Sequence, residues 1–268
     1  MFKRPHLSIF LVALSFALLL SWAVAATSEE KPAGAWAGKP KTLDTDPNLV
    51  GWWKFDETAG KTASDSSRFK HNGTLKGELS FDRNSADGKI GKALRLGGKE
   101  DMVEIKDYKG ITGTKPRSVT AWIKTNKTDG EIVAWGENDF GRMFYCRHIR
   151  GRIGVTPDGG YLYMKEYTND DTWHHIGAVV IEAPADSPGP NLHDHVKLYL
   201  DGELAVIDDI GLLDLWPLTT GKDIDVRLCR GFTGLLDDVR IYDRALSEDE
   251  VKALFQQKTD QPLKKTKE

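Results

Sequence analysis

The feature that most constrains the fold is a long series of short segments in which apolar and polar residues alternate. Alternation with a period of two is the pattern of a β-strand that buries one face. Turn signals separate the segments, among them Asp-Gly pairs at 87–88, 129–130 and 201–202. The predicted strands are 50–55, 92–96, 102–105, 118–124, 131–136, 142–147, 152–156, 161–167, 173–181, 195–200, 203–207, 225–229 and 235–242. Many strands without intervening helices predict an all-β fold, either a β-sandwich or a jelly roll.

The last predicted strand carries an acidic residue on its apolar side. In the alternation of 235–242, Asp237 shares a face with apolar neighbours. Burying an unpaired carboxylate is costly, so Asp237 needs a cation or strong hydrogen bonds. Ser247 and Glu250 then form a capping-box pattern ahead of an apolar stripe, which predicts one short C-terminal helix.

The N-terminus has the pattern of a signal peptide at 1–26. Lys3 and Arg4 precede an apolar run at 7–20, and small residues follow at 23–26. A retained anchor is the alternative, although the run is shorter than the roughly 20 residues of a membrane span. Cleavage predicts a secreted, periplasmic or cell-surface protein with no membrane span in the mature chain.

Composition indicates one globular domain after this segment. The 268 residues are 40% hydrophobic and 29% charged, which suits a folded core. Residues 27–46 and 257–268 lack periodicity and are predicted to be a flexible linker and a flexible tail. The single domain is therefore predicted at 47–256.

The charge and the cysteines limit the partners and the cross-links. The formal net charge is −3, and loss of Lys3 and Arg4 gives −3 − 2 = −5, so binding to nucleic acid is not expected. Cys146 and Cys229 are the two cysteines. An even count in an exported protein favours a disulfide between them, and two buried thiols are the alternative.

Eight short motifs follow one another in an order that resembles a known family. They are LVGWWKFDE (49–57), ASDSS (63–67), HNGTL (71–75), GKALRL (91–96), SVTAWI (118–123), TWHHI (172–176), VKLYLDG (196–202) and GLLDDVRIYDRALS (234–247). In this order they resemble the LamG-like jelly-roll domain of the concanavalin A-like lectin/glucanase superfamily. The resemblance implies two antiparallel sheets curved over each other, with the N- and C-terminal strands paired.

The resemblance also implies a structural calcium ion near the joined ends of the chain. Calcium takes six to eight oxygen ligands. The matching positions are Asp237, Glu57, Asp65, Asp56 and Asn72. The turn at 68–73 is more basic than the family's usual Gly-Asn-Gly turn. The alternative is that these acids accept hydrogen bonds from turn amides or pair with Arg240 or Arg244.

A basic run at 141–152 supplies a candidate binding surface. It carries four arginines and one histidine in an otherwise acidic chain. Arginine makes bidentate contacts with carboxylate and sulfate-like groups. The predicted binding residues are Arg142, Arg152, Trp135, Tyr161 and Tyr163. They predict a platform for an acidic polysaccharide or an acidic protein, and a solvated face balanced by nearby acids is the alternative.

No catalytic or transition-metal site is predicted. Glycosidases of this fold need two flanking carboxylates, and the nearest pattern, 137–139, is followed by Arg142 in place of a third acid. Neighbouring histidines at 174–175 would point to opposite faces of a strand. The predicted function is a secreted, non-catalytic binding module for carbohydrate. An envelope protein-interaction or structural module is the alternative, and a glycan-degrading enzyme is the third reading.

Overall fold

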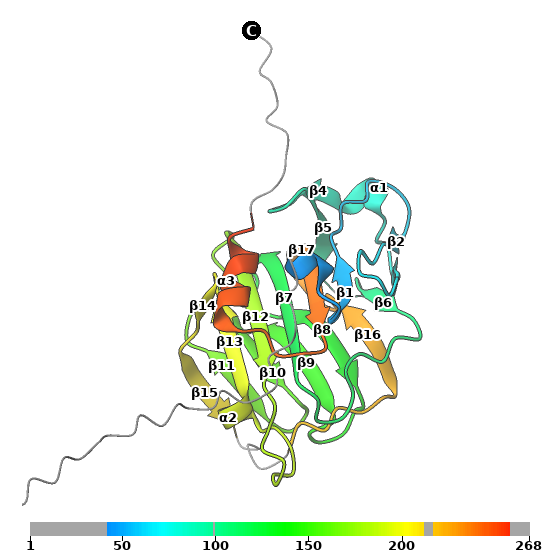
Figure 1. Ribbon diagram of the computed structural model, residues 1–268. Coiled ribbons are helices and arrows are strands. Elements are labelled where there is room, and N and C mark those ends of the chain that lie inside the picture. Colours follow the sequence, from blue (N-terminus) through cyan, green and yellow to red (C-terminus); the bar gives the residue numbers. More distant parts are fainter. Residues whose placement is uncertain (1–41, 99, 212–216, 258–268) are drawn as a thin grey trace, which may run out of the picture. The chain divides into compact units, whose positions relative to one another are not determined.

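A computed structural model describes residues 42–98, 100–211 and 217–257. They belong to the compact unit Pro40–Glu268, while the other unit, Met1–Lys39, lies outside the described residues together with the predicted signal peptide. The unit contains two antiparallel sheets, as predicted (Figure 1). Sheet A runs in the order β14, β13, β12, β7, β17, β5, β4, with β1 also paired to β17. Sheet B runs in the order β15, β11, β10, β9, β8, β16, β6, β3, β2.

The strand bounds follow the alternating segments, with four strands outside them. Sheet A contains β1 (Leu49–Trp53), β4 (Ser85–Asp87), β5 (Lys92–Gly97), β7 (Arg117–Lys124), β12 (Trp173–Val180), β13 (Val196–Leu200), β14 (Glu203–Leu204) and β17 (Thr233–Tyr242). Sheet B contains β2 (Thr62–Ala63), β3 (Gly73–Leu75), β6 (Val103–Ile105), β8 (Gly130–Gly136), β9 (Met143–Ile149), β10 (Arg152–Thr156), β11 (Tyr161–Met164), β15 (Ile207–Gly211) and β16 (Ile224–Leu228). The additional strands β2, β3, β4 and β15 are short or lie next to sheet edges.

The core lies between the two sheets because each sheet turns its apolar face inward. Val119, Ala121 and Ile123 of β7 are fully buried in it, as are Ile153 and Val155 of β10. Burial of an aliphatic side chain contributes about 1.5–3 kcal/mol. The first and last strands also pair, since β1 runs antiparallel to β17, as the resemblance implied.

The C-terminal helix α3 (Glu248–Phe255) forms as predicted and covers the outer side of sheet A (Figure 1). Ser247 accepts from the Glu250 amide, and the Glu250 side chain accepts from the Ser247 amide. Val251 and Leu254 bury against sheet A in a second, smaller apolar cluster. Two single-turn helices that were not predicted, α1 (Phe81–Asn84) and α2 (Leu192–His195), also form. No helix among the described residues is long and apolar enough to cross a membrane.

A β-bulge in β17 corrects the predicted position of Asp237. Asp238 has a left-handed φ of 47°, and the pairing with β7 shifts register between Asp237 and Arg240. A bulge adds one residue and so reverses the alternation beyond it. Leu236, rather than Leu235, therefore shares the core with Val239. Asp237 lies on the other face of sheet A, where it is paired with Trp122 of β7.

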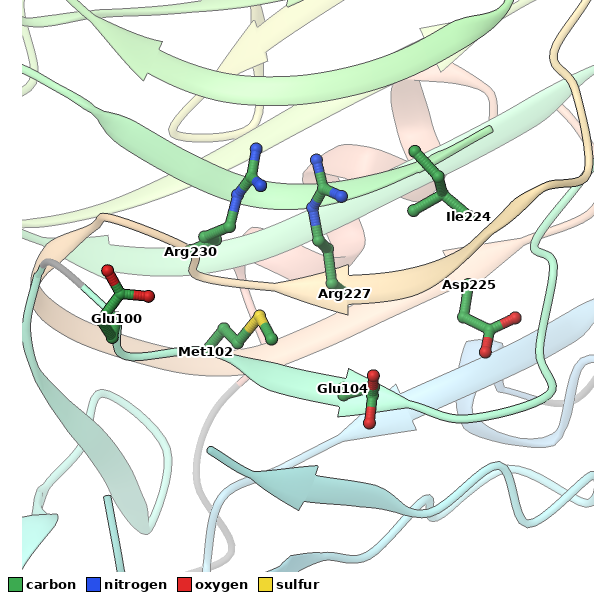
Figure 2. Close-up of a pocket in the computed structure, with 7 residues that line it drawn as sticks. All are labelled: Glu100, Met102, Glu104, Ile224, Asp225, Arg227 and Arg230. Atoms are coloured by element: carbon green, nitrogen blue, oxygen red, sulfur yellow. The ribbon is translucent and has the colours of Figure 1, made fainter. Parts of the chain in front are cut away.

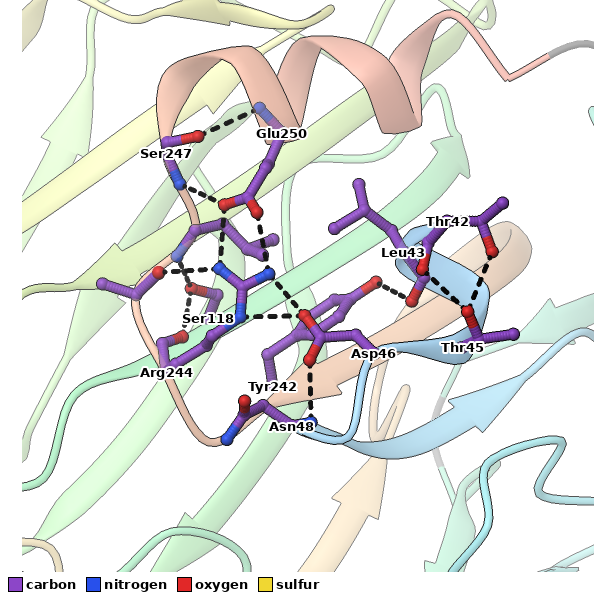
Figure 3. Close-up of polar contacts among 12 residues, drawn as sticks. Thr42, Leu43, Thr45, Asp46, Asn48, Ser118, Tyr242, Arg244, Ser247 and Glu250 are labelled. Carbon is purple, nitrogen blue, oxygen red and sulfur yellow. Dashed lines mark hydrogen bonds and ion pairs between the residues drawn. The ribbon is translucent and has the colours of Figure 1, made fainter. Parts of the chain in front are cut away.

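The segment before β1 is tied to the end of the chain. The 3-10 helix η1 (Leu43–Thr45) lies beside β17, and Asp44 accepts from Arg240 at 2.6 Å. Figure 3 shows Arg244 between Asp46 and Glu250, bonded to both. Residues 42–46, which the sequence places in the linker, are thus held against the sandwich.

The predicted disulfide is absent because one strand separates the two cysteines. Cys146 of β9 pairs with Val133 of β8, and the Cys229 amide bonds to Ile132 from the opposite side of β8. Strands lie about 5 Å apart, so two spacings exceed the roughly 7 Å limit between bridged Cα atoms. Both cysteines are free and buried. Burial raises the pKa of the Cys146 thiol to about 12 and also raises that of Cys229.

Candidate functional site

The outer face of sheet B carries a continuous surface of arginines and tyrosines. We call it the arginine face, and it comprises Arg147, Arg152, Arg227, Arg230, Tyr145, Tyr161 and Tyr163. The pleat creates it, because alternate residues of β9, β10 and β11 point away from the core. One row shows the arrangement: Glu131, Arg147, Gly154, Tyr163 and Asp209 are directly paired across β8, β9, β10, β11 and β15. Directly paired residues share one face.

Two glycines make room for the tyrosine rings. A Cβ on Gly154 would lie 2.0 Å from the ring of Tyr163, and one on Gly211 would lie 1.9 Å from the ring of Tyr161. The two rings stack with centroids 5.0 Å apart. Tyr163 is only 6% exposed, whereas Tyr161 is half-buried. The open aromatic surface on this part of the face therefore belongs to Tyr161.

Arg152 is held in place beside these tyrosines. Its guanidinium lies 5.7 Å from the ring centroid of Tyr163. It pairs with Asp208 at 2.8 Å and with Asp209 at 3.7 Å. Arg152, Tyr161 and Tyr163 are thus brought together as predicted, and the charge of Arg152 is compensated.

Arg147, at the centre of the face, differs from the other arginines of the face because it forms no ion pair with any described residue. It is half-buried, and its buried Nε, like that of Arg152, has no hydrogen-bond partner. Its guanidinium lies 6.0 Å from the ring centroid of Tyr145. A partly buried cation without a partner carries an unrecovered desolvation cost, which an anionic ligand would offset.

The two arginines nearest to β6 share one carboxylate. Glu131, which is 7% exposed, accepts from Arg227 at 2.8 Å and from Arg230 at 2.5 Å. Arg227 also lies 5.7 Å from the ring centroid of Tyr145. Three of the four arginines on this face therefore pair with a total of three carboxylates, which are Glu131 and, at the β15 edge, Asp208 and Asp209.

A pocket of about 310 Å³ opens beside Arg227. Figure 2 shows the side chains of Arg227 and Arg230 on one side and the carboxylates of Glu104 and Asp225 on the other. The lining residues are Glu100, Met102, Glu104, Ile224, Asp225, Arg227 and Arg230. Because Arg227 belongs to both, the pocket and the arginine face form one surface.

Two predicted binding residues lie elsewhere. Trp135 is fully buried in the core and donates from Nε1 to the Ile111 carbonyl at 2.9 Å, so its prediction as a ligand platform was wrong. Arg142 precedes β9 whereas Arg152 follows it, and a seven-residue strand spans about 23 Å. Arg142 instead pairs with Glu137 at 2.5 Å.

The face includes residues that the sequence reading did not select. Tyr145 and Arg147 alternate within the basic run itself, so their shared face could have been read from the period. Arg227 and Arg230 come from β16 and the turn after it, about eighty residues later. Only the sheet order, in which β8 separates β16 from β9, brings them onto the same face as Tyr145 and Arg147. Sequence patterns do not give that order.

The predicted calcium ligands separate into two groups. In the first, Asp65 is saturated: its oxygens accept from the amides of Trp52, Ser67 and His71 at 2.7–2.8 Å. Asn72 Oδ1 accepts from the Asp65 amide at 2.9 Å. Glu57 Oε1 accepts from the Ser64 amide at 2.7 Å. This group fixes the turn at 64–72, as the hydrogen-bond alternative describes.

The second group is Asp56 and Asp237, which flank one turn. Asp56 accepts from the Lys92 amide and Asp237 from the Ile90 amide, each at 2.8 Å. A Cβ on Gly88 would lie 2.7 Å from Asp237 Oδ2, so the turn is pressed against this carboxylate. Asp237 Oδ1 is buried without a partner, and burial raises the pKa of Asp237 to about 8.

These two carboxylates fit a hard cation better than the first group does. Their oxygens and the carbonyls of the turn are the donor types that calcium takes. Asp237 Oδ1 is left without a hydrogen-bond partner; Glu57 Oε2 in the first group is also unpartnered, but Asp65 beside it is saturated. Among the described residues, no three His, Cys, Asp or Glu side chains converge as a metal cluster.

The remaining acids and histidines have structural partners. Glu137, the nearest match to a glycosidase acid, is paired with Arg142. His174 lies between Asp201 at 2.9 Å and Asp170 at 3.1 Å, whereas His175 is buried against Trp122. The two neighbouring histidines thus have separate surroundings, in agreement with the strand argument.

Comparison with known families identifies the class of this domain. The model of the concanavalin A-like lectin/glucanases superfamily matches residues 96–252, which is more than half of the chain. The chain therefore belongs to the concanavalin A-like lectin/glucanase superfamily. No curated protein matches the sequence.

Several solved structures are similar to this chain at low sequence identity, and the first of them shares its fold. Domain 4 of AbnA, an extracellular arabinanase from Geobacillus stearothermophilus solved with arabinotriose, is 21% identical with a TM-score of 0.55; the match covers 77% of this chain and 98% of that one. The receptor-binding domain of botulinum neurotoxin type G is 15% identical with a TM-score of 0.49, over 78% of this chain and 51% of that one. The binding domain of Paraclostridial Mosquitocidal Protein 1 is 17% identical with a TM-score of 0.47, over 78% and 52%.

Proposed function

We propose that this domain is a non-catalytic carbohydrate-binding module that recognises an acidic polysaccharide on the arginine face. The observation that carries the proposal is Arg147, a half-buried guanidinium without a carboxylate partner at the centre of the face. Carboxylate and sulfate groups of a sugar chain would complete its hydrogen bonds. Tyr161, which stacks on Tyr163 of the same face, supplies an open aromatic ring for the apolar face of a sugar.

Two further facts support a binding module. The chain belongs to a superfamily that is described as lectin-like, although fold alone does not assign function. Domain 4 of AbnA, with which this chain shares its fold, was solved with arabinotriose. Within the face, Arg147, Arg152 and Arg227 belong to strands β9, β10 and β16, so these binding groups are preorganised.

Affinity electrophoresis tests this function. Polygalacturonate or a sulfated galactan in the gel is expected to retard the domain, while neutral arabinan and β-glucan leave it unretarded. Arg147→Gln is expected to remove most of the retardation. Arg142→Gln changes the net charge equally, but its arginine is already paired with Glu137, so it serves as the matched control. Equal retardation of both variants, or equal binding to neutral and acidic chains, contradicts the proposal.

We further propose that Asp237 and Asp56 hold a structural calcium ion. The support is the buried, unpartnered Oδ1 of Asp237 beside a second carboxylate on the same turn. Saturating calcium should raise the melting temperature above that in EGTA, because a ligand bound only to the folded state stabilises it. Asp237→Asn should abolish this shift and melt no lower than the parent in EGTA. A calcium shift that survives in the variant contradicts this site.

We also propose that the protein is exported, by cleavage after Ala25 or Ala26. The support is the basic, apolar and small-residue order of 1–26. The N-terminal sequence of the protein from the envelope or medium of its host should begin at residue 26 or 27. Recovery with residues 1–26 intact would instead support the anchor.

Protein binding is the second candidate function, at the edge formed by β14 and β15. Leu204, Val206 and Ile210 are 50%, 58% and 38% exposed there, an unusual concentration of exposed aliphatic side chains. A photocrosslinker at position 206 should yield a discrete protein adduct in the envelope, and one at Thr62 of β2 should not. Absence of an adduct at both positions removes this candidate.

A further inference from the structure

We infer that the pocket between β6 and β16 binds a sugar unit that carries both a protonated amine and an acidic group. This inference rests on the proposed function, because the pocket continues the arginine face through Arg227. It narrows the ligand from any acidic polysaccharide to one with amino-bearing acidic units. The reason is the separation of charge across the pocket (Figure 2).

One wall of the pocket offers guanidinium donors. Arg227 and Arg230 both use Nε and Nη2 to bond Glu131, and neither Nη1 has a partner within the described part of the chain. The side chain of Arg230 is 48% exposed. Two cations share one carboxylate, so this wall keeps a positive excess and two guanidinium nitrogens without a partner among the described residues.

The opposite wall offers carboxylates. Lysines that lie outside the pocket lining bond two of them, since Lys76 pairs with Glu104 at 2.7 Å and Lys109 with Asp225 at 2.6 Å. Glu100 is exposed and forms no ion pair among the residues that the structure describes. A protonated amine next to Glu100 and Glu104 would complete this wall, as a carboxylate would complete the other.

The floor and the size of the pocket suit one sugar ring. Met102 and Ile224 lie between the two charged walls and offer apolar contact. Ile224 packs with Ala134, Met143 and Tyr145 of the neighbouring strands. A volume of about 310 Å³ is near the lower limit of small-molecule pockets, which excludes a folded chain and admits one monosaccharide unit.

Three monosaccharide probes separate the contributions of the two walls. Muramic acid carries an amine and a carboxylate, glucosamine only the amine, and glucuronic acid only the carboxylate. In NMR titrations we expect muramic acid to bind about tenfold more tightly than either of the others, with the largest shifts at Met102, Glu104 and Arg227. Equal affinity for the three probes overturns the inference.

Single substitutions assign each charge to its wall. Glu100→Gln should reduce the affinity for muramic acid and glucosamine, which carry the amine, and leave the affinity for glucuronic acid unchanged. Arg230→Gln should reduce the affinity for muramic acid and glucuronic acid, which carry the carboxylate, and leave the affinity for glucosamine unchanged. Both residues are exposed, so the variants should fold. Glu248→Gln and Arg95→Gln, exposed residues of α3 and sheet A, are the matched controls.

The outcomes distinguish this inference from the proposed function. Retardation by polygalacturonate that depends on Arg147, together with no binding of muramic acid, overturns the pocket inference alone. Loss of the polygalacturonate interaction, with muramic acid still bound in the pocket, overturns the proposed polysaccharide face alone.

Discussion

The two outer faces of the sandwich use the same residue types in different ways. On sheet A, Arg240 and Trp52 stack at 4.1 Å, and Arg240 is 1% exposed beneath η1 and bonded to Asp44 and Asp238. On sheet B, Arg147 stacks on Tyr145 but has no carboxylate partner. Arginine next to an aromatic ring therefore does not by itself mark a binding site. The sheet A face is structural because η1 and α3 cover it and the charge of its arginine is paired. The sheet B face is not covered in this way, and Arg147 is left available to a ligand.

The largest expected loss of stability comes from a substitution in the covered outer face of sheet A, which we call the closed face. Arg240→Gln removes a buried cation and leaves Asp238, which is 5% exposed, without its charge partner. Loss of one member of a buried pair costs about 3–5 kcal/mol. Arg147→Gln should change the free energy of unfolding by less than about 1 kcal/mol, because no ion pair is lost. Urea denaturation measures both, and equal destabilisation would show that the two faces are alike.

A similarly large loss of stability is expected at Trp135, whose side chain lies in the core and not on the arginine face. Trp135→Ala should destabilise by about 3–5 kcal/mol, the usual cost of truncating a buried tryptophan. The affinity of the folded variant for an acidic polysaccharide should match that of the parent. A loss of affinity in a variant that is fully folded would show that Trp135 belongs to the binding site.

A smaller loss of stability is expected when the pH is lowered, and its origin is again in the closed face. Burial lowers the pKa of His175 to about 4, below its unfolded value of 6.5. The unfolded chain therefore binds more protons in this window, so stability falls as pH drops from about 6.5 to 4. His175→Gln should remove this contribution, on the order of 3 kcal/mol at most. Urea denaturation of parent and variant across this pH window measures the difference.

His174 is the matched control for this pH dependence. Its hydrogen bond to Asp201 raises its pKa, so its contribution is present at low pH and is lost as pH rises through the folded pKa. His174→Gln should therefore give a difference of the opposite sign. Parallel pH profiles of the parent and His175→Gln would contradict the buried, neutral state of His175.

The smallest expected effect is a change in ligand affinity at the arginine face. Tyr161→Ala removes the open ring that stacks on Tyr163 and should weaken binding to an acidic polysaccharide by about 1 kcal/mol. Tyr163→Phe, which keeps a covered ring, should bind like the parent. Isothermal titration with oligogalacturonate measures both, and a larger loss for Tyr163→Phe would contradict the assignment of the open aromatic surface.

The sequence predicted the sheets because their signal is local. The alternation, the Asp201–Gly202 turn between β13 and β14 and the Ser247–Glu250 capping box each involve neighbours in the chain, and these formed, whereas Gly130 of the predicted 129–130 turn is the first residue of β8. The bulge at Asp238 could not be read in this way. It changes the phase of β17 by one residue, and its cause is tertiary, since Asp238 holds Trp52 at 2.5 Å and Arg240 at 2.9 Å.

The site was predicted only where it lies within consecutive strands. Arg152, Tyr161 and Tyr163 come from the neighbouring strands β10 and β11, and the pattern placed them together. Cys146 and Cys229 were paired wrongly because β8 inserts between their strands, which depends on sheet order. The same sheet order brings Arg227 to Tyr145, and for the same reason it was missed.

An NMR titration of the ¹⁵N-labelled domain with oligogalacturonate tests the central contrast most directly. We predict saturable amide shifts centred on Tyr145, Arg147 and Gly154 of sheet B, with His175 and Phe255 of the covered sheet A face unmoved. Shifts centred on the sheet A face, or none at a concentration that retards the domain in gels, would contradict the account.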